Sequence, residues 1–147
     1  MAQHIWRLGR ATRLLGLPAL VASCTSLAPH EPSLPAGAAQ IAAPAVYAEW
    51  EQRTRACSGL SGDFSTVQFY VVPGVDTFPT EAGAKVGMWN REGRVNRIVI
   101  AGNYLNHEMV VRHEMLHALL QREGHPPDYF VDRCHLTWET WNSGLGD

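Results

Sequence analysis

The pattern of hydrophobic and polar positions divides the 147-residue chain into three stretches of different character. A short apolar run at residues 14–22 is followed by a segment rich in alanine, proline and glycine. Only from about Ala45 do apolar residues recur at the spacings of regular secondary structure. The pattern therefore predicts a signal peptide over residues 1–23, a flexible tether over residues 24–44 and one folded domain over residues 45–147.

The first half of the expected domain contains one helix and one strand. Val46, Trp50 and Cys57 have helical spacing, which predicts a helix over residues 45–56. A β-branched and aromatic run at residues 67–72 predicts a strand, and the proline-glycine pair that follows ends it. Residues 75–84 are expected to form a loop.

A hairpin and a second helix are expected next. Residues 85–89 and 95–101 flank a polar turn at residues 90–93, which is typical of a β-hairpin. A helix is predicted over residues 107–122, with Gly124 just past its end. The remaining residues are short, aromatic and irregular, with room for one more helix near residues 136–141. The expected fold class is α+β, with an N-terminal helix, a small antiparallel or mixed sheet and a second helix.

Composition agrees with a soluble globular domain. Hydrophobic residues make up 46% of the chain and the formal net charge is −2, which excludes an intrinsically disordered chain. Lysine and arginine form no cluster, so nucleic acid is not an expected partner.

The N-terminal segment resembles the signal peptide of a bacterial lipoprotein. Basic residues precede the apolar run, which at nine residues is too short to span a bilayer. The sequence Val21-Ala22-Ser23-Cys24 resembles the lipobox, in which the cysteine becomes the lipid-modified N-terminus. This resemblance implies a membrane anchor on Cys24 and a location in the bacterial cell envelope. Thr25 replaces the aspartate that retains many such proteins in the inner membrane, which favours the outer membrane, facing the periplasm or the surface. An ordinary secretory signal is the alternative.

Cysteine usage is consistent with export. If Cys24 carries lipid, Cys57 and Cys134 remain as an even pair, which in an exported protein predicts a disulfide. Two buried free thiols are the alternative. A bridge would close a loop of 77 residues, which in the chain-entropy model contributes about 4 kcal/mol to stability.

The second predicted helix contains the sequence His113-Glu114-Met115-Leu116-His117. Histidines four residues apart on a helix project from one face, so both ring nitrogens can reach one metal ion. Glu114 is adjacent to the first histidine and can take a proton from a water that the metal activates. The spacing predicts zinc as the cofactor, His113 and His117 as ligands and Glu114 as general base.

These residues resemble the zincin metallopeptidases, in which a helix carries the His-Glu-x-x-His sequence and a nearby edge strand binds the peptide substrate. The resemblance covers about residues 64–128. More specifically, the chain resembles small bacterial lipoproteins that carry this helix followed by a His-Pro segment and a cysteine. It implies a minimal zincin-like core and a peptide or protein substrate, and the hairpin strand before the helix is in the right order to be the edge strand.

The third zinc ligand cannot be carried over from the best-known branches, because Glu123 occupies the position of their third histidine. His125 is the favoured ligand, since it directly follows the expected end of the helix. Asp128 is an alternative because more chain is available for it to fold back. Glu139 is another, at a separation found in branches that use a glutamate from a second helix. A helix that continued through Arg122 would rise about 7 Å beyond His117, so His125 requires an early end or a sharp turn.

Three functions remain open from the sequence. The favoured one is a lipid-anchored zinc metallopeptidase, with Tyr104, Tyr129 and His135 as candidates to stabilise the oxyanion. The second is a zinc-dependent hydrolase of a non-peptide substrate. The third is a non-catalytic envelope lipoprotein that binds zinc.

Overall fold

A computed structural model describes residues 33–145 of the chain. The predicted signal peptide, Cys24 and the first part of the predicted tether lie outside these residues. No helix among the described residues combines the length and apolar character needed to cross a bilayer.

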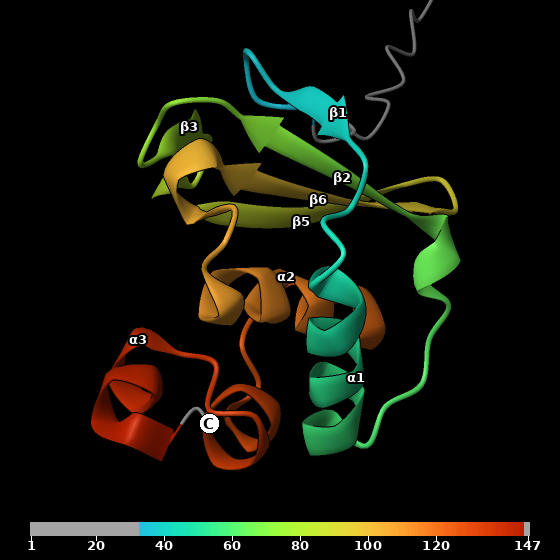
Figure 1. Cartoon of the computed structure of the whole chain (residues 1–147), viewed down its shortest axis with the longest axis vertical. Coiled ribbons are helices and arrows are strands. Elements are labelled where there is room, and N and C mark those ends of the chain that lie inside the picture. Colours follow the sequence, from blue (N-terminus) through green and yellow to red (C-terminus); the bar gives the residue numbers. More distant parts are fainter. Residues whose placement is uncertain (1–32, 146–147) are drawn as a thin grey trace, which may run out of the picture. The chain divides into compact units, whose positions relative to one another are not determined.

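The centre of the fold is a four-stranded mixed sheet with the strand order β1-β2-β6-β5 (Figure 1). β2 (Val67–Val72) runs parallel to β6 (Val95–Ala101), whereas β5 (Gly87–Glu92) and β1 (Ala39–Ile41) are antiparallel to their neighbours. β5 therefore lies at one end of the strand order. The expected α+β class with a small mixed sheet is confirmed.

Strand β1 corrects the expected extent of the tether. The sequence pattern assigned residues 24–44 to a flexible linker, yet Ala39 pairs with Val71 and Ile41 pairs with Phe69. Ile41 also packs against the main hydrophobic core. Alanine and glutamine have low strand propensity, so this strand depends on pairing with β2 and not on its own residues. The folded domain thus begins before Ala45.

The hairpin of β5 and β6 is confirmed, with its turn displaced. β5 continues to Glu92, so the turn consists of Gly93 and Arg94, and Gly93 adopts a φ of 58°. Two-residue hairpin turns favour glycine at such positions. The expected loop before it contains a second small hairpin, β3 (Phe78–Thr80) and β4 (Gly83–Lys85). Phe78 is buried against β2 and β6 and holds this hairpin in place.

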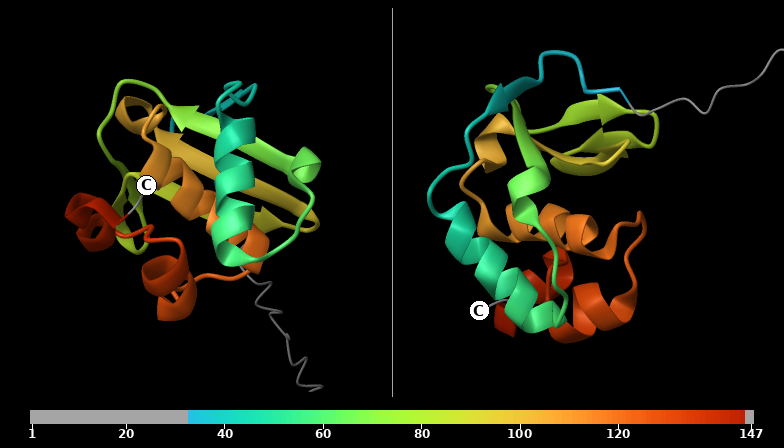
Figure 2. Two further views of the ribbon diagram at one scale, coloured as in Figure 1. Left: turned by 60° about the horizontal axis from the view of Figure 1, so that its bottom comes forward. Right: turned by 90° about the vertical axis from the view of Figure 1, so that its right-hand side faces the viewer.

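Two helices cover the face of the sheet opposite the one on which Phe78 packs (Figures 1 and 2). These are α1 (Tyr47–Ser58) and α2 (Glu108–Leu120), close to the helices expected from the sequence. Ten of the 13 residues of α2 are buried. A helix buried around most of its circumference must be covered on more than one side. The sheet covers one side of α2, and α1 and the C-terminal segment cover the others.

The C-terminal segment lies on the side of α2 that faces away from the sheet (Figure 2). It consists of a π-helical turn at Asp128–Arg133, the short helix α3 (Trp138–Thr140) and a second π-helical turn at Trp141–Leu145. The predicted disulfide between Cys57 and Cys134 is confirmed, with an S–S distance of 2.02 Å. It fastens this segment to the last turn of α1.

Candidate metal centre

His113 and His117 lie one turn apart on α2, with ring centroids 5.0 Å from each other. Leu116 and Met115 between them are fully buried and anchor the helix in the core. Both imidazoles therefore emerge from the same face of a rigid element, as the spacing predicts.

The helix ends early enough to permit a third ligand. It stops at Leu120, and Gln121 adopts a left-handed conformation with a φ of 53°. The backbone N–H of Gln121 donates to the carbonyl of His117 at 2.8 Å, which closes the last turn. The chain then reverses direction instead of rising past His117. Gly124, expected directly after the helix, lies farther along the loop.

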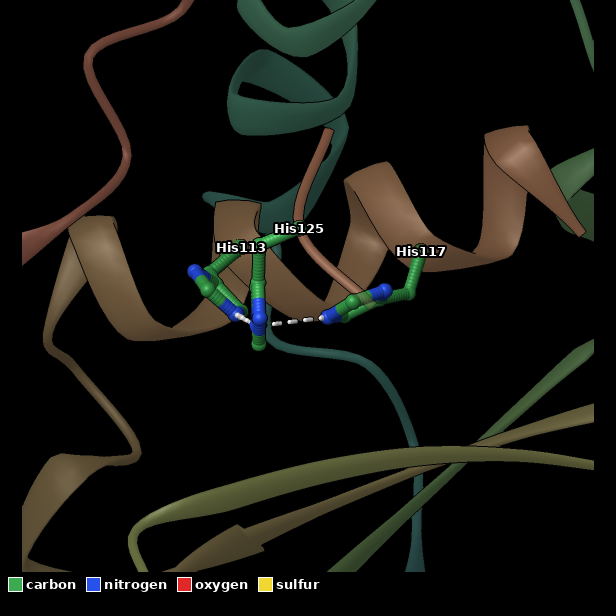
Figure 3. Close-up of side chains that lie close together, drawn as sticks. All are labelled: His113, His117 and His125. Atoms are coloured by element: carbon green, nitrogen blue, oxygen red, sulfur yellow. Dashed lines mark hydrogen bonds between the residues drawn. The ribbon is translucent and has the colours of Figure 1, made fainter. Parts of the chain in front are cut away.

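This reversal brings His125 to the two histidines of α2. Its Nε2 atom lies 2.9 Å from Nε2 of His113 and 3.3 Å from Nε2 of His117 (Figure 3). The three side chains converge on one point from the helix and from the loop that follows it. Together they form a group of nitrogen donors within 4.8 Å of one another that could hold a metal ion.

The other ring nitrogen of each α2 histidine faces a backbone carbonyl. Nδ1 of His113 lies 2.7 Å from the oxygen of Leu136, and Nδ1 of His117 lies 3.1 Å from the oxygen of Arg122. A carbonyl only accepts, so each Nδ1 carries the proton. Each Nε2 of a neutral ring then presents a lone pair toward the common point. Such carbonyl partners orient the metal-binding histidines of known sites.

The two short contacts of His125 cannot both be hydrogen bonds in this protonation state. With Nε2 of His113 and of His117 unprotonated, a single proton on Nε2 of His125 could satisfy only one of the two short contacts. Ligand nitrogens about 2.0–2.1 Å from a tetrahedral zinc ion lie roughly 3.3 Å apart. The two contacts of His125, at 2.9 and 3.3 Å, are close to that separation, and all three donor atoms lie within 4.8 Å of one another. The residues present thus fit a small divalent cation bound by three imidazoles.

The surroundings keep the histidines neutral. Phe130 is fully buried, and its ring centroid lies 4.7–4.9 Å from those of all three imidazoles. Burial lowers the pKa of His113 to about 3 and that of His117 to about 4, and it also lowers the pKa of His125. Neutral imidazole is the metal-binding form, so protons compete poorly for these nitrogens at neutral pH.

The chain was also compared with known proteins. It matches no family model, no curated protein and no solved structure.

The alternative third ligands lie elsewhere. Asp128 is exposed at the start of the π-helical turn, and Glu139 is exposed in α3. Neither belongs to the group of close donor atoms found among residues 33–145, and His135 does not belong to it either. Of the ligands considered from the sequence, His125 is the one that the fold brings to His113 and His117.

Glu114 points from α2 toward the edge strand β5 and is 6% exposed. A Cβ atom built on Gly87 would lie 2.7 Å from Oε1 of Glu114, so only glycine leaves room for this carboxylate. The backbone of Trp89 favours the charged form of the same carboxylate. Burial raises the pKa of Glu114 to about 8, although Lys85 and the Trp89 hydrogen bond oppose the increase.

Trp89 connects the edge strand to the end of α2. Its indole ring stacks on the imidazole of His117 at a centroid distance of 6.2 Å. The indole N–H donates to Oδ1 of Asn96 at 3.1 Å, and Nε2 of Gln121 donates to the same oxygen at 3.0 Å. Asn96 thus joins the strand to the residue at which the helix ends. This network holds β5 beside the metal-binding face.

The oxyanion candidates have other partners. Tyr104 packs edge-on against Trp138, and the ring of Tyr129 lies under the guanidinium of Arg133. Neither ring packs on the three histidines. The structure instead adds residues that the sequence did not single out: Phe130, Gly87, and the carbonyls of Arg122 and Leu136. A backbone carbonyl or a packing phenylalanine has no signature in a single sequence.

Proposed function

We propose that this chain is a zinc-dependent hydrolase that cleaves peptide bonds, with a minimal zincin-like site. The observation that carries the proposal is the convergence of three imidazole nitrogens, two of them on a helix whose buried Glu114 lies against the edge strand of the sheet. Structural zinc sites use four protein ligands, whereas catalytic sites use three and leave one position open. Among residues 33–145 the donor group contains three residues, which favours the catalytic type.

Zinc is the metal that this donor set favours. Imidazole nitrogen is a borderline ligand suited to zinc, and neither calcium nor magnesium selects a site without oxygen donors. Bound zinc would polarise a carbonyl group and lower the pKa of a coordinated water to about 7.

Glu114 supplies the acid-base chemistry. Its carboxylate accepts a proton from the attacking water and then delivers it to the leaving amine. A residue that both accepts and donates works best with a pKa near the working pH, and burial moves the pKa of Glu114 in that direction. The absence of a side chain at Gly87 leaves room for the carboxylate beside β5, so the base lies at the strand edge.

The edge of β5 supports a peptide substrate. The N–H of Ala101 donates to the carbonyl of Val86, which fixes the register of the pairing. In an antiparallel pair, alternate residues hydrogen-bond to the partner strand and the residues between them do not. The backbone N–H and C=O groups that point to β6 therefore belong to Met88, Asn90 and Glu92. Those that point away from the sheet edge belong to Gly87, Trp89 and Arg91. Among residues 33–145, β5 pairs with β6 alone. An extended peptide could therefore add to this edge directly beside Glu114.

The decisive experiment separates zinc binding from hydrolysis. The zinc-loaded native protein is expected to cleave members of a broad peptide library. Glu114→Gln is expected to retain one equivalent of zinc and to lose cleavage. Glu123→Gln, on the exposed loop, is the control and is expected to retain both zinc and cleavage. Full zinc occupancy without cleavage of any peptide would refute peptidase activity and favour the non-peptide or non-catalytic functions.

We further propose that the protein is exported and anchored through lipid on Cys24. The disulfide between Cys57 and Cys134 supports export, because disulfides persist in oxidising compartments and are rare in the cytosol. The lipobox resemblance supports the anchor. The substrate would then be a peptide or protein of the cell envelope or its surroundings.

A further inference from the structure

Lys85 is the only lysine in the chain and the last residue of β4. Two residues later Gly87 lies against the carboxylate of Glu114. Because consecutive Cα atoms are 3.8 Å apart, the backbone of Lys85 is within about 7.6 Å of that of Gly87. The side chain is exposed. A long, flexible cation therefore begins at the rim of the site.

The strand that follows Lys85 runs along the candidate site. Gly87 lies against the carboxylate of Glu114, and the indole of Trp89 stacks on the imidazole of His117. The Lys85 side chain therefore starts beside the residues that flank the three histidines, and interactions between charges in water weaken within about 10 Å at ordinary salt concentration. None of the ion pairs formed among residues 33–145 includes Lys85. No protein carboxylate in that part of the chain neutralises this charge in a direct ion pair.

The charge balance of the centre calls for an anion. Three neutral imidazoles leave the full 2+ charge on a bound zinc ion. Among residues 33–145 the group of close donor atoms contains no carboxylate, and Glu114 adds one negative charge at the neighbouring strand edge. With Lys85 added, the loaded site is net positive. Such a site attracts the anionic part of a substrate and rejects cationic ones.

We propose that Lys85 binds a carboxylate of the substrate close to the scissile bond and thereby determines specificity. The preferred substrates are then peptides with a free C-terminal carboxylate or an Asp or Glu side chain beside the cleaved bond. This inference rests on the proposed hydrolytic function. Lysine suits the role because its ammonium is a mobile point charge that reaches a carboxylate without a fixed geometry.

The test uses zinc-loaded full-length protein and matched peptide pairs. One pair differs only in a C-terminal acid or amide, and two others differ in Glu or Gln on either side of the scissile bond. The native protein is expected to prefer one acidic member by about tenfold or more in kcat/KM, through KM, as expected for a charge-assisted contact. The pair that shows the preference identifies the source of the carboxylate.

Two substitutions and one control assign the preference to Lys85. Lys85→Gln is expected to bring the ratio of kcat/KM for acidic over neutral peptides near unity, with zinc affinity unchanged. Lys85→Arg keeps the positive charge and is expected to keep most of the preference for acidic peptides. Arg94→Gln removes one positive charge at the other end of β5 and is expected to leave the ratio unaltered. A uniform decrease in kcat for acid and amide peptides would overturn the inference, because it would indicate a role in the transition state.

A binding measurement separates this inference from the proposed function. The same peptides are titrated into zinc-loaded Glu114→Gln protein and its Lys85→Gln double variant, with calorimetry as the readout. Tighter binding of the acidic member that disappears in the double variant supports carboxylate recognition even if the native protein cleaves nothing. Equal dissociation constants for acidic and neutral peptides would refute it, whatever the hydrolytic activity.

Discussion

Nδ1 of His113 lies 2.7 Å from the carbonyl oxygen of Leu136, so a residue in the C-terminal segment orients a candidate ligand on α2. Leu136 follows Cys134 by two residues, and Cys134 is bonded to Cys57 at the end of α1. The orientation of the first ligand therefore depends on a crosslink between two elements that do not themselves contribute donors. The candidate metal centre is assembled from the helix, the loop after it and the segment that the disulfide fastens.

His125 is expected to be the third zinc ligand. His125→Ala should weaken zinc binding by more than about a hundredfold, because even the loss of an outer partner of a ligand costs 10–100-fold. Asp128→Asn and Glu139→Gln should leave zinc affinity unchanged, since both residues lie outside the donor group. Competition with a chelator of known affinity measures all three. If the Asp128 or Glu139 variant lost more zinc affinity than the His125 variant, that residue and not His125 would be the third ligand.

Gly87→Ala is expected to remove activity while zinc remains bound. The new methyl group would lie 2.7 Å from Oε1 of Glu114, and the carboxylate must move away from the edge strand. Displacement of a general base lowers kcat by roughly 10²–10⁴-fold. In a Glu114→Gln background the same substitution should cause no further loss. An additive effect in the double variant would show that Gly87 acts through some other residue.

The stability of the metal-free protein is expected to decrease as the pH rises from 6.5 to 8. The folded-state pKa of Glu114, about 8, exceeds its ordinary value of 4.5, so in this range the folded protein holds a proton that the unfolded chain has lost. The decrease should be about 2 kcal/mol over this range, at about 1.4 kcal/mol per pH unit. It should be absent in Glu114→Gln. Urea denaturation at several pH values measures it.

The histidines act in the opposite direction at lower pH. Their folded-state pKa values, about 3 for His113 and about 4 for His117, lie below the ordinary 6.5. The unfolded chain therefore binds more protons between about pH 3 and 6.5, and stability rises with pH in that range. His117→Gln should reduce the rise in stability between pH 3 and 6.5. It should leave the decrease between pH 6.5 and 8, which depends on Glu114, unchanged. A slope that persists unaltered would indicate that His117 titrates normally in the folded protein.

Loss of the disulfide is expected to weaken both the fold and the metal centre. Cys57→Ser with Cys134→Ser should lower the free energy of unfolding by about 4 kcal/mol, as the chain-entropy model gives for a loop of 77 residues. Zinc affinity should fall roughly 10–100-fold, because the carbonyl of Leu136 is no longer held against His113. Thermal unfolding and chelator competition measure the two effects. Unaltered zinc affinity would show that the C-terminal segment docks without the crosslink.

Cys24→Ser is expected to release the protein from the membrane fraction of a bacterial host. Lipid attached to the cysteine of a lipobox is the predicted anchor, and serine cannot form the thioether. Incorporation of labelled fatty acid into the native chain, but not into the variant, is the direct measurement. Membrane association that survives the substitution would exclude Cys24 as the anchor.

Local patterns predicted the elements that carry the site. The β-branched run at residues 67–72 became β2 with the expected bounds, and the apolar run before the turn into α2 became the end of β6. The relation of His113, Glu114 and His117 follows from helix geometry alone, and one sequence therefore suffices to predict it. Strand β1 has no such pattern, because its residues are held by the neighbouring strand.

The position of His125 depends on contacts that one sequence does not reveal. Glycine at position 124 indicated where the helix would stop, yet it stops at Leu120 with a non-glycine residue in the left-handed conformation. The hydrogen bond from Gln121 to Asn96, 25 residues earlier, holds that residue in place. The end of the helix is therefore decided by tertiary structure, and so is the approach of the third ligand.

Gln121 and His135 are the only non-glycine residues with positive φ among residues 33–145, and they bracket the stretch that contains His125. The left-handed conformation costs such residues about 1–2 kcal/mol each. This strain would be released if the stretch between them opened, whereas ligand bonds from His125 would hold it closed. The protein would thus sense its own metal: an empty centre favours an open loop that proteases can reach, and a filled one protects it. Limited proteolysis with and without zinc would report the occupancy of the site as a cleavage pattern.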